Sequence, residues 1–191
     1  MELIFVRHGQ GQHTLNPPDS LYMENPSLTE AGREQALLLR HNLPLDNGDI
    51  VIISPTRRTL ETAYYWAGDS NADLIVTPVV SPRMFPQKAG KITLPCDEII
   101  RKEKVKCVLP TCSIDQHSSD NLWNNGINTM ADQEFRILGG KFLRWCKQQS
   151  KEKIYIVSHD GTITSYRQLV STRLFSRKDF LEDAAWVSER Y

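Results

Sequence analysis

Residues 3–9 read Leu-Ile-Phe-Val-Arg-His-Gly, and residues 154–161 read Ile-Tyr-Ile-Val-Ser-His-Asp-Gly. In both stretches an apolar run, mostly of β-branched or aromatic residues, is followed at once by a polar cluster with a histidine and a glycine. A third run, Ile50–Ile53, has the same character and precedes Ser54-Pro-Thr-Arg57-Arg58. Short apolar runs bounded by polar residues are typical of strands that are buried on both faces of a parallel sheet.

Helical patterns separate these runs. Ser27-Leu-Thr-Glu30 has the spacing of a capping box and predicts a helix from there to about Leu43, which Pro44 ends. A fourth candidate strand is Leu74–Val80, although Pro78 interrupts it. Three more helices are expected, at Arg57–Ala67, Thr129–Gln149 and Gly161–Val170. This alternation predicts an α/β fold, a three-layer α/β/α arrangement with a mostly parallel sheet.

Length and composition favour one globular domain over residues 1–191. The chain has 191 residues, of which 40% are hydrophobic and 24% charged, close to the average for globular proteins. The region from 81 to 128 is weakly patterned and contains Pro82, Pro86, Pro95 and Pro110. Two interpretations of it remain open: a surface insertion, or a cap that faces the substrate over the strand ends.

The charge balance argues against several classes of partner. Lys and Arg number 23, Asp and Glu also number 23, and so the basic excess of a nucleic-acid-binding protein is missing. The first residues lack the features of a signal peptide, and no window approaches 18 apolar residues, so a cytoplasmic protein without a membrane span is expected. The cysteines match no zinc pattern and are expected to be free thiols: Cys96, Cys107, Cys112 and Cys146. The oligomeric state is unknown.

Two histidines and two arginines follow strands of the predicted sheet. Because ligands collect at the carboxyl ends of parallel strands, Arg7, His8, His159 and at least one of the adjacent Arg57 and Arg58 are expected to converge there. Guanidinium groups beside helix N-termini suit a dianionic phosphoryl group. A histidine nitrogen can attack phosphorus, and the cations stabilise the charge of the transition state, so this chemistry requires no metal and no cofactor.

Four motifs together resemble the histidine phosphatase superfamily, which includes cofactor-dependent phosphoglycerate mutase. They are Arg7-His-Gly, Leu28-Thr-Glu-Ala-Gly-Arg-Glu-Gln-Ala36, Ser54-Pro-Thr-Arg-Arg-Thr-Leu-Glu-Thr-Ala63 and Ser158-His159, in that order. The resemblance covers nearly the whole chain and implies a phosphoglycerate mutase-like fold. The stretch from Arg7 to His13 and Leu94-Pro-Cys-Asp97 are similar to a phosphatase-like subgroup of plants, fungi and bacteria.

The resemblance also implies roles for individual residues. His8 is expected to be the nucleophile that becomes phosphohistidine, Arg7 and Arg58 to clamp the phosphoryl oxygens, and His159 to donate a hydrogen bond to them. Arg58 falls on the arginine position of the family's motif, so Arg57 is expected to point outward from its helix. Gln10 and Thr14 fall where the family contacts phosphate or substrate, although the family often has Asn at the position of Thr14.

The general acid of the family is missing from its usual place. The resemblance predicts a Glu shortly after the third strand, but no Asp or Glu occurs between Asp73 and Asp97. Asp160 is the first candidate for the proton donor, because it follows His159 at a strand end and the acid phosphatase branch carries its acid there. Asp160 could instead only cap the following helix, which leaves Asp97 or Glu98 as the alternative.

These residues predict a phosphomonoesterase that hydrolyses a small phosphorylated substrate through a phosphohistidine on His8. A phosphomutase of the same family is the second hypothesis. A non-catalytic module that binds a phosphorylated ligand is the third, because the family's Glu is absent. A metal site formed by His8, His13, His159 and Asp160 is disfavoured, since the neighbouring arginines would repel the cation.

Overall fold

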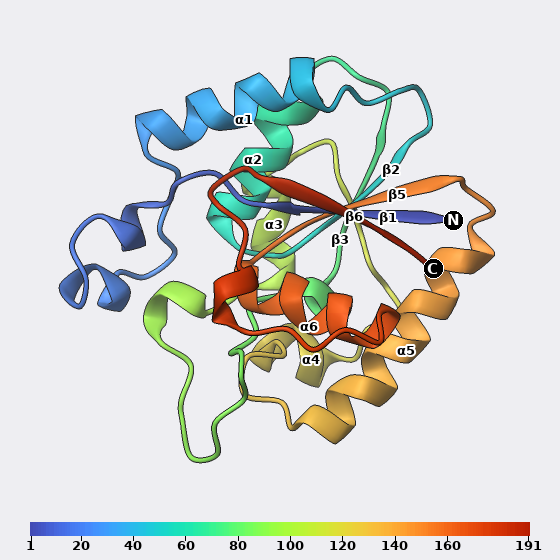
Figure 1. Cartoon of the computed structure of the whole chain (residues 1–191). Helices are drawn as coiled ribbons and strands as arrows, with labels where there is room; N and C mark the ends of the chain where they lie inside the picture. The colour runs from blue at the N-terminus through green and yellow to red at the C-terminus, as the bar shows by residue number, and fades with distance from the viewer.

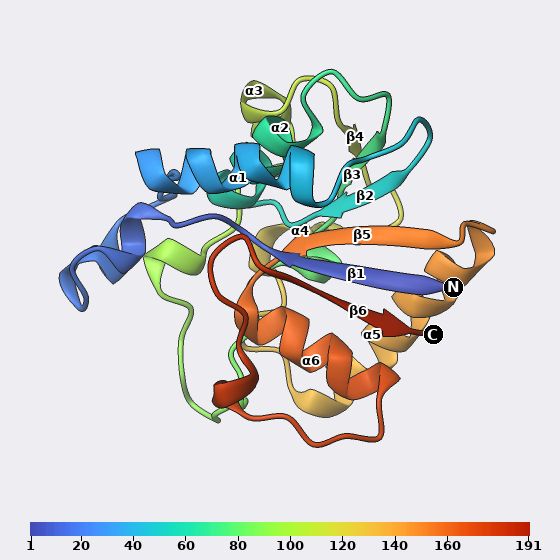
Figure 2. The same cartoon turned by 45° about the horizontal axis from the view of Figure 1, so that its top comes forward.

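The computed structural model describes all 191 residues and contains one six-stranded sheet in the order β4-β3-β2-β5-β1-β6 (Figures 1 and 2). The strands are β1 (Glu2–Arg7), β2 (Ile50–Ile53), β3 (Asp73–Val76), β4 (Ser113–Ile114), β5 (Lys153–Ser158) and β6 (Trp186–Arg190). Only β6 runs antiparallel to its neighbour, β1; the other neighbouring strands are parallel. The predicted α/β fold with a mostly parallel sheet is confirmed.

Helices cover both faces of this sheet. On one side lie α1 (Glu30–Asn42) and α2 (Arg57–Ala67), and on the other α5 (Asp132–Gln148) and α6 (Asp160–Val170) (Figure 2). Two short helices, α3 (Val105–Val108) and α4 (Asp120–Asn125), belong to the region from 81 to 128. None of these helices is both long and apolar enough to cross a membrane.

Strand β1 explains why the apolar runs show no alternation. Ile4 and Val6 pack into the core on the side of α1 and α2, whereas Leu3 and Phe5 pack into the core on the side of α5 and α6. Successive side chains of a strand point to opposite faces, and here both faces are covered, so every position of the run is apolar.

Several element boundaries differ from the sequence prediction by one to three residues, as at α5, which begins at Asp132 and not at Thr129. Two of the differences have a visible local cause. Thr29, and not Ser27, is the N-cap of α1, because the Thr29 hydroxyl accepts a hydrogen bond from the amide of Gly32 at 3.0 Å. Strand β3 ends at Val76, and the predicted continuation Pro78–Val80 forms a turn of 3₁₀ helix. Proline has no N–H to donate to a neighbouring strand, which explains this end.

The region from 81 to 128 contributes to the core. Its strand β4 pairs with β3 at the edge of the sheet, and the side chains of Val105, Leu109 and Trp123 are buried in the core on the α1 and α2 side. It is therefore not a surface insertion throughout. The short 3₁₀ turn Pro95–Asp97 of the same region contacts the polar cluster at the strand ends.

The start of α1 packs directly on the loop that follows β1. A Cβ atom on Gly32 would lie 2.1 Å from the carbonyl oxygen of Gln10, and one on Gly9 would lie 2.4 Å from the carbonyl oxygen of Gly32. Only residues without a Cβ allow this approach of two backbones. The contact fixes the loop in which His8 lies.

The two chain ends lie side by side, as Figures 1 and 2 show. The amino group of Met1 donates to the carbonyl oxygen of Tyr191 at 3.1 Å, and the amide of Tyr191 donates to the carbonyl oxygen of Met1 at 3.0 Å. These two hydrogen bonds continue the antiparallel pairing of β1 with β6. The four cysteines are free thiols, and of these only Cys107 is exposed.

Candidate active site

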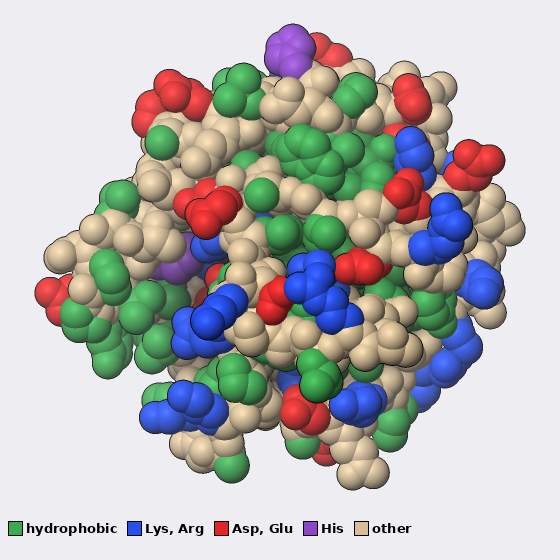
Figure 3. Space-filling view, viewed as in Figure 1, with side chains coloured by type: hydrophobic (Ala, Val, Ile, Leu, Met, Phe, Trp, Pro, Cys, Tyr) green, Lys and Arg blue, Asp and Glu red, His purple; other side chains and the backbone are tan.

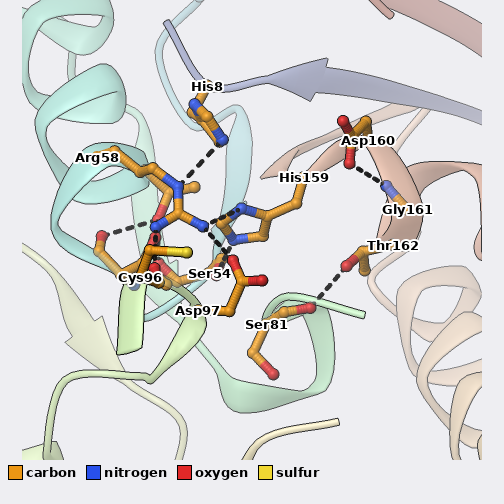
Figure 4. Close-up of polar contacts among 12 residues, drawn as sticks. His8, Ser54, Arg58, Ser81, Cys96, Asp97, His159, Asp160, Gly161 and Thr162 are labelled. Atoms are coloured by element: carbon orange, nitrogen blue, oxygen red, sulfur yellow. Dashed lines mark hydrogen bonds and ion pairs between the residues drawn. The ribbon is translucent and has the colours of Figure 1, made fainter. Parts of the chain in front are cut away.

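Three of the predicted site residues meet at the carboxyl ends of neighbouring strands. His8 follows β1, His159 follows β5, and Arg58 lies in the first turn of α2, after β2. Only 3%, 5% and 1% of their respective surfaces are exposed. The Arg58 guanidinium lies between the two imidazoles: Nε donates to His8 Nε2 at 3.1 Å, and Nη2 donates to His159 Nδ1 at 3.1 Å (Figure 4).

The contacts of His8 show which of its two ring nitrogens carries the proton and which one presents a lone pair. Its Nδ1 lies 2.7 Å from the carbonyl oxygen of Gly9, which only accepts, so Nδ1 carries the proton and Nε2 presents the lone pair. Burial first, and then the charge of Arg58, hold the pKa of His8 well below its ordinary value. The ring is therefore neutral at pH 7, which is the nucleophilic form.

His159 has a partner on each ring nitrogen. Because Arg58 can only donate, Nδ1 of His159 accepts, and Nε2 donates to the hydroxyl of Ser54 at 2.8 Å. Burial and the charge of Arg58 also lower the pKa of His159 well below its ordinary value. The predicted hydrogen bond from His159 to a phosphoryl oxygen stays a prediction.

Asp97 occupies the remaining side of Arg58. Arg58 Nη2 donates to Asp97 Oδ1 at 2.9 Å, and Nη1 donates to the carbonyl oxygen of Cys96 at 2.6 Å (Figure 4). Burial raises the pKa of the Asp97 carboxyl, although Arg58 acts in the opposite direction. The region from 81 to 128 thus brings a carboxyl group to the histidines. The sequence offered Asp97 only as an alternative proton donor.

Arg7 and Asp160 lie beside this cluster and contact each other. Arg7 Nη1 donates to the carbonyl oxygen of Leu181 at 2.6 Å, while Nη2 is 3.2 Å from Asp183 and 3.7 Å from Asp160. The other carboxyl oxygen of Asp160 accepts from the amide of Gly161 at 2.6 Å and caps α6. Sequence reasoning missed Asp183, because the segment between α6 and β6 carries no recognisable motif.

Helix α2 is oriented as predicted, with Arg58 directed toward the strand ends and Arg57 toward solvent. Arg57 is exposed and forms an ion pair of 2.7 Å with Glu61 one turn further along the helix, whereas the adjacent Arg58 is buried. Consecutive residues of a helix point about 100° apart, so only one of the two can face the strand ends.

Gln10 and Thr14 make local contacts and do not touch the histidines. The Gln10 side-chain oxygen accepts from the hydroxyl of Thr29 at 2.8 Å, and the exposed Thr14 donates its hydroxyl proton to the carbonyl oxygen of Gly11 at 2.9 Å. Their contacts with substrate stay predictions.

His13 lies beside His8, although sequence reasoning considered it only as a member of a disfavoured metal site. Its ring centroid lies 5.6 Å from that of His8, and its Nδ1 is buried without a hydrogen-bond partner. Burial, with the charges of Arg58 and Arg7, lowers the pKa of His13 to about 3. No group of three or more His, Cys, Asp or Glu side chains is arranged to hold a metal ion.

A cavity of about 540 Å³ opens beside the cluster. Its lining includes His159, Asp97 and Asp160, and its walls come from the segment 82–94 and from Phe180. In the space-filling view of Figure 3, a histidine is visible in a hollow on the left side of the molecule, with Lys or Arg side chains and hydrophobic side chains below it. A ligand can reach the polar cluster from this side.

Comparison with known families agrees with this geometry. The profile of the histidine phosphatase superfamily (branch 1) matches residues 3–177. The chain belongs to the histidine phosphatase superfamily. Membership supports an enzyme of the phosphatase type, and the matched range includes His8, Arg58, Asp97 and His159.

Curated members of the superfamily match over different lengths. A phosphoglycerate mutase-like protein of Arabidopsis thaliana is 27% identical over 192 residues, which cover 83% of this chain and 68% of that protein. A Schizosaccharomyces pombe protein named as a phosphatase is 39% identical over 62 residues, which cover 31% of this chain and only 29% of that protein.

Solved structures of superfamily members share the fold. The α-ribazole phosphatase of Shigella flexneri has a TM-score of 0.61 at 23% identity, covering 98% of this chain and 89% of that one. A phosphoserine phosphatase of Entamoeba histolytica has a TM-score of 0.56 at 20% identity, with the same coverage of each chain. At these identities the likeness concerns the fold alone.

Proposed function

We propose that the protein is a phosphomonoesterase that hydrolyses a small phosphorylated molecule through a phosphohistidine on His8. The observation that carries this proposal is the buried pair of His8 and Arg58, in which a neutral imidazole presents Nε2 beside a permanent cation. Membership of the histidine phosphatase superfamily supports the same conclusion.

The reaction proceeds in two displacements. His8 Nε2 attacks phosphorus, the bond from phosphorus to the alcohol oxygen breaks, and that oxygen takes up a proton as the alcohol leaves. Water then attacks the phosphohistidine, the N–P bond breaks, and phosphate and neutral His8 result. Arg58 and Arg7 stabilise the charge on the equatorial oxygens in both steps. For His159 to donate to the same oxygens, its Nε2–H must exchange the hydroxyl of Ser54 for a phosphoryl oxygen.

Two carboxyl groups compete for the role of proton donor. Asp160, the first choice from the sequence, is held by two contacts: one carboxyl oxygen accepts from the amide of Gly161 at 2.6 Å, and the other lies 3.7 Å from Arg7. Asp97 lines the same cavity, its carboxyl pKa is raised, and it lies within 2.9 Å of the guanidinium that clamps the phosphoryl group. These contacts favour Asp97 as the general acid, with Asp160 as the alternative.

Turnover of para-nitrophenyl phosphate tests the proposal. We expect the wild type to release phosphate and a rapidly quenched reaction to contain acid-labile phosphate bound to the protein. His8→Ala should abolish both signals, whereas His41→Ala, which changes an exposed histidine of α1, should change neither. Unimpaired turnover by His8→Ala would exclude the covalent mechanism.

Turnover of a phosphoester that carries further hydroxyl groups, such as glycerol 3-phosphate, separates the two other hypotheses, because para-nitrophenyl phosphate has no isomer that a mutase could form. A non-catalytic module that binds a phosphorylated ligand would show no turnover with any phosphomonoester. A phosphomutase would convert a phosphoester into its isomer, with little release of inorganic phosphate. Both products are measured in one reaction.

A further inference from the structure

The cavity beside His159 has walls that are largely apolar. The rings of Phe85 and Phe180 line it and pack against each other, with centroids 6.3 Å apart and inclined at 57°. Met84 and Leu94 extend the apolar surface toward Asp97. A leaving group attached to a phosphate at His8 would lie against these side chains, because the cavity and the polar cluster share His159.

The nearby arginine of this wall turns its charge away from the cavity. Arg83 donates to the carbonyl oxygens of Ile127 at 3.2 Å and of Met130 at 2.6 Å, and pairs with Asp132 at 2.5 Å. Its guanidinium also lies 4.3 Å from the centroid of the Phe135 ring. Its donors are therefore engaged inside the protein, and they do not recognise the hydroxyl groups of a ligand.

Two cations at the rim have no carboxylate partner. Lys91 and Arg177 line the cavity, and neither forms an ion pair within the protein. The Arg177 guanidinium lies 5.5 Å from the centroid of Phe180, next to the aromatic pair. Their charge attracts a dianionic phosphate into an otherwise apolar opening.

We propose that the natural substrate is a phosphomonoester of an apolar alcohol that contains a ring, rather than of a sugar or another polyhydroxylated alcohol. This proposal rests on the phosphomonoesterase function above. A ring that packs against the Phe85–Phe180 pair loses contact with water, which lowers the free energy of the complex. The hydroxyl groups of a sugar placed against the same apolar part of the wall lose hydrogen bonds to water that Phe85, Phe180, Met84 and Leu94 do not replace. Hydrolysis consumes one water and yields the ring alcohol and inorganic phosphate.

Benzyl phosphate and glycerol 3-phosphate test this preference. Both are esters of primary alcohols, so that the difference between them reports mainly on contacts with the cavity. We expect kcat/KM to be about tenfold or more higher for benzyl phosphate, since a well-buried ring contributes on this scale. Glucose 6-phosphate should behave like glycerol 3-phosphate.

Variants of Phe180 connect the preference to the cavity. Phe180→Ala should lower the ratio of the two kcat/KM values about fivefold or more, and Phe180→Leu should restore much of it because leucine keeps most of the apolar surface. The matched control is Tyr64→Ala, which removes an aromatic ring that is 54% exposed on α2, outside the cavity. This control should leave the ratio unchanged.

The outcomes for substrate class and function are distinguishable. Equal kcat/KM values for benzyl phosphate and glycerol 3-phosphate, or an unchanged ratio in Phe180→Ala, would overturn the proposed substrate class. Phosphate release that depends on His8 would still support a phosphomonoesterase in that case. If none of the esters is hydrolysed, both proposals fail together.

Discussion

The side chain of Arg58 is buried, and its charge has one carboxylate partner, Asp97. A buried cation is costly unless a paired group compensates it, and Asp97 supplies this compensation. A dianionic phosphoryl group that binds Arg58 approaches the same carboxylate. Because two neighbouring anions repel each other, the bound phosphate raises the pKa of Asp97 further and favours its protonated form. In the proposed mechanism, Asp97 would thus take up a proton at the stage at which the leaving group needs one.

Exchange of each carboxyl group for an amide identifies the general acid. We predict that Asp97→Asn lowers kcat for benzyl phosphate by about 10²-fold or more but affects para-nitrophenyl phosphate much less, because nitrophenolate leaves without a proton. Asp160→Asn keeps the oxygen that accepts from Gly161 and loses the charge beside Arg7, so it should change both rates to a similar extent. Glu98, the other candidate from the sequence, is exposed and lines a different pocket from Asp97, so Glu98→Gln should change neither rate. The opposite pattern would assign the acid to Asp160, as the sequence indicates.

The two adjacent arginines of α2 offer a second comparison. We predict that Arg58→Ala lowers kcat/KM about 10²–10³-fold, as for the loss of one preorganised donor in other enzymes. Arg57→Ala loses only an exposed ion pair with Glu61 and should cost less than threefold. Circular dichroism spectra of both variants should match that of the wild type, which checks that they fold. Equal losses would mean that Arg58 is not the clamp of the phosphoryl group.

At the level of elements, the sequence predicts those whose signal is local. The apolar runs predict β1, β2 and β5, and the bounds Arg57–Ala67 of α2 are confirmed. Strand β6 was not predicted, because Trp186-Val-Ser-Glu-Arg190 lies at an edge and its exposed and half-buried positions alternate. Strand β4 has only two residues. Strands β4 and β6 form because they pair with segments that are distant in the sequence, and a local sequence pattern does not reveal such pairing.

The same reason separates the site residues that were predicted from those that were missed. His8, Arg58 and His159 lie directly at strand ends, so their convergence follows from the parallel sheet. Asp183, which sequence reasoning missed, and Asp97, which it offered only as an alternative proton donor, reach the site through irregular segments whose paths are set by tertiary packing. Sequence reasoning therefore identified the histidines and Arg58 more easily than the carboxyl groups around them.

The glycine contact between α1 and the loop after β1 leads to a prediction on stability. Gly32→Ala places a Cβ 2.1 Å from the backbone oxygen of Gln10, so a backbone has to shift, and we expect a loss of about 1–3 kcal/mol in the free energy of unfolding. The matched variant Gly140→Ala lies within α5, where the nearest atom is the flexible Arg144 side chain at 3.6 Å. It should stabilise the protein by up to about 1 kcal/mol. Urea denaturation measures both, and equal effects would contradict this account.

For the molecule as a whole, the buried histidines make stability depend on pH. The pKa values of His8, His13 and His159 are all lowered in the folded state. Below about pH 6.5, the unfolded chain therefore binds protons at these positions that the folded protein does not bind. Their contribution to stability is complete above pH 6.5 and is lost progressively as the pH falls. The raised pKa values of Asp97 and Asp183 act in the opposite direction.

A variant of His13 isolates one of these contributions. Between pH 6.5 and about 3, His13 removes up to about 1.4 kcal/mol of stability per pH unit. We predict that His13→Gln, which cannot take up this proton, loses less stability than the wild type from pH 6.5 to 4.5 in urea denaturation. His41→Gln, an exposed control, should follow the wild type. Parallel curves for all three proteins would show that His13 does not stay neutral in the fold.

The hydrogen bonds between Met1 and Tyr191 bring the first and last residues within reach of a short glycine linker. Such a linker would turn the polypeptide into a ring, which could be reopened in the exposed turn at Asn47 and Gly48, between α1 and β2. This circular permutant would keep every strand, helix and site residue of the original and change only their order in the gene. In it, the motif with His159 would precede the motif with His8, so the order of the motifs is not required by the architecture that brings them together.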